Sequence, residues 1–294
     1  MTTPLVFDRP LVRRRLARAL DQGYADFLLA RAVEDLDERL STVLRSFDLA
    51  LDVGTPTPIA AEALRRSGHV ETVIRLSPVP ERGSIVGDEE RLPFSGERFD
   101  LAVSLLALHG VNDLPGSLIQ IRRALKADGL FIGALLGGST LTELRQSLTQ
   151  AEAEIEGGVS PRVAPFADLR DIGGLLQRAG FALPVTDTDV VRVRYANAFA
   201  LMRDLRRMGL TNALHDRRKT PMRRATLMRA AEIYAERFGD ADGRIPATFE
   251  IVWLSGWTPH ESQQKPLRPG SAKARLADAL GVKEGAPAPK PDQT

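Results

Sequence analysis

Residues 47–54, with the sequence FDLALDVG, are typical of a buried β-strand that ends in a glycine turn. Helical and strand patterns alternate beyond this segment. The sequence predicts helices at 59–67 and 114–125, strands at 70–76, 84–87, 99–106 and 130–136, and a turn at 127–129. Repeated strand–helix–strand units predict an α/β fold, in which helices cover both faces of a parallel sheet. Such sheets bind ligands at the carboxyl ends of their strands, so we expect a site where the 47–53 strand ends.

The flanking regions define the expected domain organisation. We expect an N-terminal helical segment in 1–45, an α/β domain in 46–265 with a helical insertion at about 197–240, and a flexible C-terminal tail in 266–294. The tail is rich in Pro, Gly, Ala and charged residues, a composition with little apolar surface to bury. Further strand patterns occur at 190–195 and 249–257, which brings the predicted sheet to seven strands.

The composition of the 294 residues excludes several classes of protein. With 43% hydrophobic residues the chain has enough apolar surface to fold, and a net charge of +2 makes it no strong attractant for nucleic acid. The sequence contains no cysteine, which excludes disulfides, thiolate metal sites and cysteine nucleophiles. We expect no membrane span, because no segment reaches ~18–20 consecutive apolar residues. The N-terminal residues lack the pattern of a secretory signal, so we expect a cytoplasmic protein, or a mitochondrial matrix protein if the source is eukaryotic.

Several motifs carry a resemblance to a known family. The most specific are Asp88–Phe94, Leu108–Pro115, Gly137–Arg145 and Gly256–Ser262. The chain resembles the class I S-adenosylmethionine-dependent methyltransferases. Within that superfamily it looks most like the complex I assembly factors that carry this fold and hydroxylate an arginine on a complex I subunit. The malonyl carrier-protein methyltransferases of biotin synthesis are more distant relatives.

The resemblance implies a Rossmann-like class I methyltransferase fold with S-adenosylmethionine as its cofactor. The positions that match the cofactor-binding pattern of the family are Asp52, Gly54, Asp88, Glu89 and Leu92. The family places an acid at the end of the first strand and a glycine-rich turn behind it, so that backbone N–H groups come close to the cofactor. In the family, the acid matched by Asp88 faces the adenine amino group.

The sequence departs from this pattern at four positions. Pro56 and Pro58 stand where the family has glycines, and proline has neither a free φ nor an N–H. Leu76 falls at the register of the acid that normally accepts hydrogen bonds from the ribose hydroxyls. Together these changes predict a cofactor affinity lower by roughly two to four powers of ten. Gly110 stands where relatives usually carry a tryptophan.

His109 and Asn112 are the candidate catalytic residues, because they follow the 99–106 strand at the edge of the sheet where catalytic side chains gather. The alternative is a hydrogen-bonded turn histidine, with Asp113 as the cap of the next helix. We expect no metal site, since the four histidines are not spaced as ligands on one helix face.

Three functions remain open at this point. The first is the modification, by hydroxylation or methylation, of a subunit side chain during complex I assembly. The second is a binding module or assembly chaperone that has kept the fold and lost the cofactor, and the third is a small-molecule or carrier-protein methyltransferase. The expected partner is a protein client, a complex I subunit, and a peripheral contact with a membrane is compatible with the sequence. The basic stretch from Arg217 to Arg224 is a solvated face or a docking surface for that client.

Overall fold

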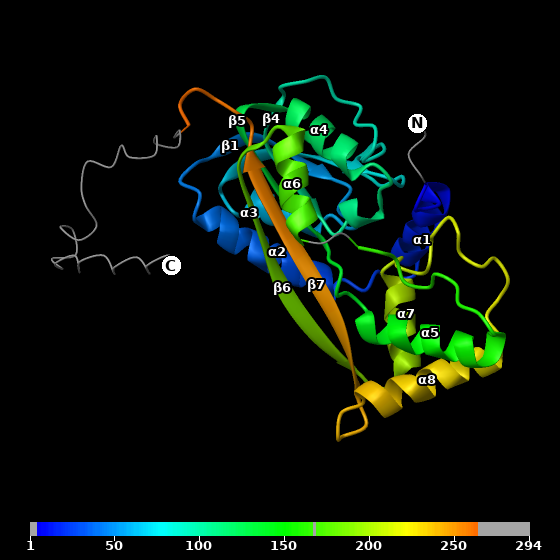
Figure 1. Ribbon diagram of the computed structural model, residues 1–294. Coiled ribbons are helices and arrows are strands. Elements are labelled where there is room, and N and C mark those ends of the chain that lie inside the picture. The colour runs from blue at the N-terminus through cyan, green and yellow to red at the C-terminus, as the bar shows by residue number, and fades with distance from the viewer. Residues whose placement is uncertain (1–4, 167–168, 264–294) are drawn as a thin grey trace, which may run out of the picture. The chain divides into compact units, whose positions relative to one another are not determined.

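The computed structural model describes residues 5–166 and 169–263. Within them a single sheet contains seven strands in the order β3-β2-β1-β4-β5-β7-β6, as Figure 1 shows in part. The strands are β1 (Phe47–Val53), β2 (Val70–Ser77), β3 (Ile85–Val86), β4 (Phe99–Leu105), β5 (Leu125–Leu136), β6 (Ala182–Tyr195) and β7 (Ile245–Trp257). The first five strands are parallel to one another, and β7 runs antiparallel to both β5 and β6. The predicted α/β fold with a mostly parallel sheet is confirmed.

Helices cover both faces of the sheet. The described helices are α1 (Arg9–Asp21), α2 (Phe27–Ser41), α3 (Ile59–Arg66), α4 (Leu114–Ala124), α5 (Thr142–Glu156), α6 (Leu169–Ala179), α7 (Ala198–Arg207) and α8 (Arg224–Phe238). The apolar core has two parts, one on each face of the sheet, because successive side chains of a strand such as β1 point to opposite faces. Ala50 packs in the core beneath α2 and α3, whereas Leu51 and Val53 pack in the core beneath α4 and α6.

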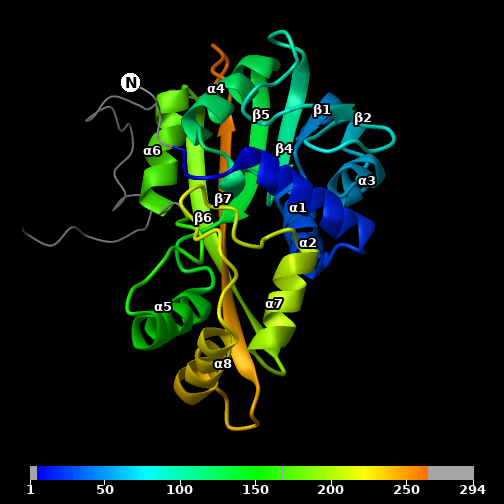
Figure 2. The same cartoon turned by 90° about the vertical axis from the view of Figure 1, so that its right-hand side faces the viewer.

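The long antiparallel hairpin of β6 and β7 extends beyond the parallel strands, and α7 and α8 belong to the connection between its two strands (Figure 1). Helix α5, which precedes α6 in the chain, packs on α8, and α1 packs on α7. Figure 2 shows α1 lying across the ends of the parallel strands, with α5, α7 and α8 below it. The predicted insertion at 197–240 is therefore part of a larger helical group that also includes α5, which sequence spacing alone did not assign to it.

One local prediction is wrong, and the structure divides another predicted region into two elements. The turn expected at 127–129 is part of β5, where the pairing register with β4 shifts between Phe99 and Leu101 and Asp128 adopts a positive φ of 61°. The turn residues therefore make a bulge and do not end the strand. The helical pattern of the N-terminal 45 residues forms two helices, because Gly23 with a φ of 85° ends α1 before α2 begins.

The chain divides into two compact units, Met1–His260 and Glu261–Thr294, and all the elements above lie in the first. Of the second unit, the structure describes Glu261–Gln263, which form a turn and a bend. The tail predicted for 266–294 lies outside the described residues. None of the described helices is long and apolar enough to cross a bilayer.

Candidate functional site

The carboxyl end of β1 places a buried acid beside a buried arginine. Asp52 pairs in register with Arg75 on β2, and the Arg75 Nε donates to Oδ2 of Asp52 at 3.0 Å. The same guanidinium also donates to the Glu81 carboxylate and to the carbonyl oxygen of Thr55. Oδ1 of Asp52 is buried and has no partner at hydrogen-bond distance, although Thr55 lies near enough to the carboxylate to lower its pKa. Burial raises the pKa of Asp52 to about 6, although Arg75 acts in the opposite direction.

The turn after β1 requires a glycine. Gly54 has a φ of 72°, and a Cβ atom there would lie 2.7 Å from Oε1 of Glu89 and 3.2 Å from Cβ of Ala107. Thr55 is fully buried, and its hydroxyl accepts a hydrogen bond from the Leu105 N–H of β4 at 3.2 Å. The turn is thus fixed to the neighbouring strand. Gly54 and Pro56 line a small cavity of about 70 Å³ that is closed on its other side by α1 and the start of α2.

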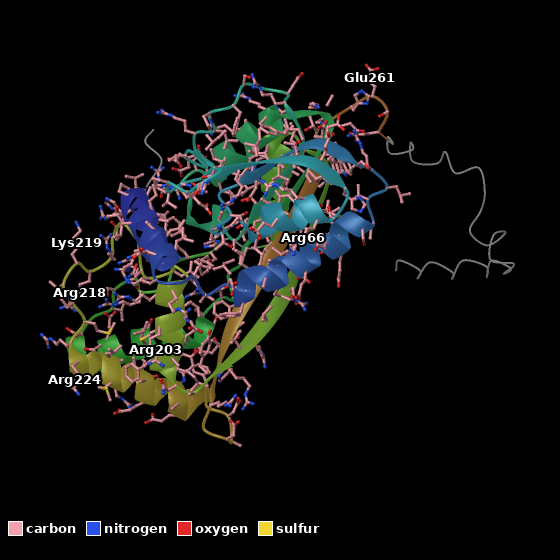
Figure 3. The ribbon with its side chains drawn as sticks, turned by 180° about the vertical axis from the view of Figure 1, so that it is seen from behind. Arg66, Arg203, Arg218, Lys219, Arg224 and Glu261 are labelled. Atoms are coloured by element: carbon pink, nitrogen blue, oxygen red, sulfur yellow. The ribbon has the colours of Figure 1, made fainter. Side chains whose placement is uncertain are left out.

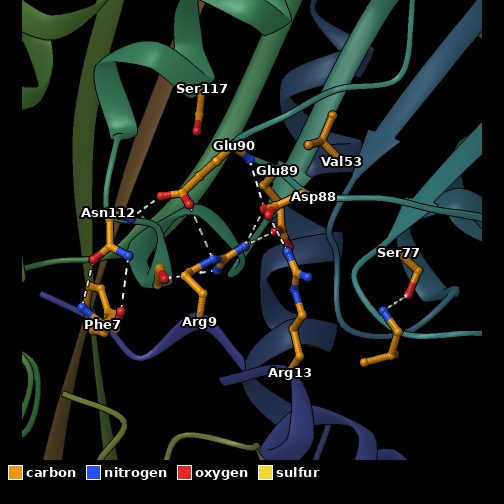
Figure 4. A network of polar contacts seen from close by, with 12 residues as sticks. Phe7, Arg9, Arg13, Val53, Ser77, Asp88, Glu89, Glu90, Asn112 and Ser117 are labelled. Carbon is orange, nitrogen blue, oxygen red and sulfur yellow. Dashed lines mark hydrogen bonds and ion pairs between the residues drawn. The ribbon is translucent and has the colours of Figure 1, made fainter. Parts of the chain in front are cut away.

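Three consecutive acids, Asp88 to Glu90, hold the first residue of α1 (Figure 4). The Arg9 guanidinium donates to Asp88 at 2.9 Å and to Glu89, and its Nε lies 3.7 Å from a carboxylate oxygen of Glu90. The Arg9 and Glu89 side chains are 10% and 4% exposed, so this is a buried ion pair. Arg13, one turn further along α1, adds a second cation to Asp88. These contacts seat α1 over the end of the sheet.

Asn112 also positions α1. Its Oδ1 accepts hydrogen bonds from the N–H groups of Val6 and Phe7 at 2.8 and 2.7 Å, and its Nδ2 donates to the Phe7 carbonyl at 3.1 Å. The side chain is therefore occupied by the segment that leads into α1. Asp113 caps α4 by accepting from the N–H of Gly116 at 2.8 Å, which confirms the cap considered from the sequence.

His109 stands between two cavities. It lies in the short 3-10 helix Leu108–Gly110, directly after β4, and its ring contacts Phe166 edge-on with centroids 5.8 Å apart. The residue is partly exposed, but its Nδ1 is buried and has no hydrogen-bond partner. Burial lowers the pKa of His109 to about 4, so the imidazole is neutral at pH 7. One cavity is the small one beside Gly54, and the other is a larger apolar cavity of about 320 Å³ enclosed mainly by residues 136–166 and 202–227.

The structure brings only part of the predicted cofactor set together. Gly54, Glu89 and His109 line the small cavity, as do Pro56 and Gly110. Asp52 lies buried behind it, and Asp88 faces Arg9 and Arg13. Leu92 lies apart, in a depression beside α4.

The remaining departures have structural consequences. Pro58 precedes the first residue of α3, a position where the missing N–H is tolerated. Leu76 is fully buried in the sheet core, and it is its neighbour Arg75 that reaches the buried acid of β1. The Asp52–Arg75 pair could have been predicted from the sequence, because the two residues lie on adjacent parallel strands. Residues in register on such strands place their side chains on the same face of the sheet.

The parallel strand order, the glycine turn after the acid of β1 and the acidic segment after β3 define a protein of the methyltransferase class. Residues 51–133 match the family described as methyltransferase domain. The YcgJ protein of Bacillus subtilis has a similar structure, with a TM-score of 0.51 at 15% identity over 79% of this chain and 99% of that chain, a likeness that shows the fold.

More similar sequences identify the family within that class. The chain is 42% identical to the mitochondrial arginine-hydroxylase NDUFAF5 of Danio rerio, across 93% of this chain and 89% of the relative. It is 41% identical to the human protein of the same name, across 93% of this chain and 83% of the relative. The chain belongs to this arginine-hydroxylase family, as its motifs predicted. The malonyl-[acyl-carrier protein] O-methyltransferase of Xylella fastidiosa is 32% identical over 86% of this chain and 89% of that protein.

Proposed function

We propose that this protein modifies an arginine side chain of a protein client, a subunit of respiratory complex I, and that it uses S-adenosylmethionine as its cofactor. The observation that carries the proposal is the identity of 41–42% with arginine-hydroxylases across 93% of the chain. Identity over this share of the chain covers the helical group as well as the sheet. The proposed subcellular location is the cytoplasm, or the mitochondrial matrix if the source is eukaryotic.

Observations at the end of β1 support a fit to the cofactor. Gly54 keeps the positive φ that lets a ligand approach the backbone, and the small cavity opens directly beside it. Asp52 has a buried oxygen without a partner, which is suited to accept a hydrogen bond from a ligand amine. We propose Asp52, Gly54, Asp88, Glu89 and Leu92 as the cofactor-binding residues, with Asp88 available once Arg9 and Arg13 release it. The bound cofactor would supply an electrophilic methyl group.

His109 and Asn112 are proposed for the substrate side. His109 is placed to contact ligands in either cavity, and its neutral imidazole can accept a hydrogen bond. Asn112 would act by holding α1 in place, because its amide is already bonded to the segment before that helix.

A binding protein that has lost the cofactor is the second candidate. Two features favour it: the Arg75 guanidinium fills the space beside Asp52, and Pro56 offers no N–H to a ligand. Membership of the arginine-hydroxylase family favours the enzyme over this alternative.

A binding measurement together with a complementation assay tests the proposal. Calorimetric titration of the purified protein with S-adenosylmethionine and S-adenosylhomocysteine should show micromolar binding that Asp52→Ala weakens. A strain that lacks the gene should regain complex I activity from the wild type and not from His109→Gln. Mass spectrometry of its complex I subunits should show a modified arginine, which carries either a methyl group that the cofactor supplies or an oxygen atom that requires a separate oxidant such as O2. Arg203→Glu, an exposed change on α7, is the control and should restore activity. Absence of binding at millimolar ligand, combined with full rescue by His109→Gln, would refute the enzymatic function and support the binding protein.

A further inference from the structure

The larger cavity is apolar over most of its wall. Leu144 and Leu148 of α5, Met202 and Leu205 of α7 and Leu227 of α8 all contribute to it. Its volume of about 320 Å³ is at the lower end of the range of ligand pockets, roughly 300–1,000 Å³. An apolar cavity of this kind gains nothing from holding ordered water, because its wall offers few hydrogen bonds.

Among the residues that the structure describes, the charged side chain in this wall is Arg162, and it is already neutralised. Arg162 donates to the buried carboxylate of Glu152, which also accepts from the Ser160 N–H at 2.8 Å. The described part of the wall therefore presents no free charge to a guanidinium or an ammonium group. A polar client side chain is poorly matched to it, and an apolar chain is well matched.

A basic groove adjoins the cavity. It is lined by five cations, Arg15, Arg162, Arg217, Arg218 and Lys219, and it shares Arg162, Thr211, Asn212 and Met222 with the cavity wall. Figure 3 labels Arg218 and Lys219 at the outer edge of this part of the molecule. The apolar space and the cationic surface are thus continuous through residues that line both.

The groove carries a net positive charge, because some of its cations are not neutralised by ion pairs. Arg217 is paired with Asp8 at 3.1 Å and Arg218 with Glu156 at 3.0 Å. In the part of the chain that the structure describes, Arg15 donates to the Thr211 carbonyl and Lys219 is exposed, and neither is in an ion pair. Burial, and after it the nearby cations Arg217 and Arg18, lower the pKa of Arg15.

We propose that the cavity and the basic groove together bind a single-chain lipid with a phosphate head group, its hydrocarbon chain in the cavity and its phosphate among the cations of the groove. Burying the methylenes of the chain removes apolar surface from water, and arginine and lysine bind phosphate through charge-assisted hydrogen bonds. This inference goes beyond the proposed function and does not depend on it, because lipid binding is measured without cofactor or client.

Oleoyl lysophosphatidic acid is the probe, titrated into the full-length protein below its critical micelle concentration. We expect micromolar binding that weakens as salt is added. Oleoyl lysophosphatidylcholine, which has the same chain and no net charge, and glycerol 3-phosphate, which has the head alone, should bind at least tenfold more weakly.

Two variants test the two halves of the site. Gly110→Trp should abolish lipid binding and leave the protein folded, because a Cβ at Gly110 meets only a Val12 methyl at 3.9 Å and the added ring can enter the cavity. Lys219→Glu should weaken binding roughly three- to tenfold, the effect of reversing one partly solvated charge. Arg203→Glu makes the same charge change on an exposed residue outside the groove and should bind as the wild type does.

The proposal is overturned by any of three results. These are no binding of lysophosphatidic acid to the folded wild type, equal binding by Gly110→Trp, or equal loss of binding in Lys219→Glu and Arg203→Glu. Binding to phosphatidylglycerol vesicles but not to the monomeric lipid would also overturn it, and would make the groove a membrane-contact surface instead.

Discussion

Replacing Arg9 with methionine should be among the most destabilising single changes at the edge of the sheet. Methionine keeps much of the length of the side chain and removes the charge. Glu89, whose side chain is 4% exposed, would then lose its buried cation. Breaking a buried pair by removing one partner costs about 3–5 kcal/mol, because the remaining charge stays uncompensated.

The expected shift in thermal stability follows from this figure. A domain of roughly this size loses about 2–4 °C in Tm for each kcal/mol, so Arg9→Met should lower Tm by roughly 6–20 °C in a calorimetric scan at pH 7.5. The loss should be smaller at acidic pH. Burial already raises the pKa of Glu89 and Arg9 opposes that rise, so without Arg9 the folded-state pKa lies still higher and protonation at low pH relieves the penalty.

Two further variants make this reasoning refutable. Arg13→Met removes a cation that is 36% exposed and pairs with the 30% exposed Asp88, and it should cost only about 0–1 kcal/mol. The double variant Arg9→Met/Glu89→Gln should recover much of the loss, because the neutral amide is cheaper to bury. Equal effects of Arg9→Met and Arg13→Met, or no recovery in the double variant, would show that Arg9 does not act through the buried pair.

The other predictions concern titration, the glycine turn and a buried hydroxyl. The raised pKa of Asp52 contributes stability below pH 4 that is lost as pH rises through about 6, whereas the lowered pKa of His109 contributes stability above pH 6.5 that is lost as pH falls through about 4. Each effect amounts to roughly 3 kcal/mol in the free energy of unfolding. Urea unfolding between pH 4 and 6.5 should therefore show stability that rises with pH in Asp52→Asn, where His109 still titrates, and stability that falls with pH in His109→Gln, where Asp52 still titrates. Parallel slopes of stability against pH in the two variants would contradict this. Gly54→Ala should lower Tm and weaken S-adenosylmethionine binding, because the new Cβ meets a buried carboxylate; unchanged values for both would contradict the close approach. Tyr234→Phe should cost about 1–2 kcal/mol in urea unfolding, because the phenol donates to the Pro246 carbonyl at 2.7 Å, and no loss would show that this bond contributes nothing.

The sheet could be predicted from the sequence because its strands are buried on both faces and have a continuous apolar pattern. Phe99–Leu105 is an example, with nearly every residue buried. The long hairpin was harder to predict, because the residues of β6 before Tyr195 are half-buried or exposed, and its sequence pattern indicates a strand only in the second half. Helix α5 could be seen as a helix, but its partner α8 is about 70 residues away, and periodicity does not specify tertiary partners.

The candidate site was predictable where the motif is local and not where it depends on register. Gly54 and Asp52 follow from one strand and its turn. The Arg9 clamp could not be found in this way, since it joins the first helix to an acidic segment 79–81 positions later. The sequence pattern points to Leu76 as the departure from the family. The residue that changes the chemistry beside Asp52 is Arg75, and only the strand register shows that these two charges meet.

The electrostatics of His109 suit the proposed substrate. An arginine side chain is cationic at every physiological pH, so a protonated histidine next to it would repel it. Because burial lowers the pKa of His109 to about 4, the imidazole stays neutral and can accept a hydrogen bond from a guanidinium without that cost. Glu89, which lines the small cavity together with His109, and its neighbour Asp88 are already paired with Arg9. A client arginine that enters the small cavity must therefore either compete with Arg9 for these carboxylates or bind through His109. The Arg9→Met variant distinguishes the two modes of binding. Removing Arg9 should raise the affinity for the client arginine only if that arginine binds the carboxylates.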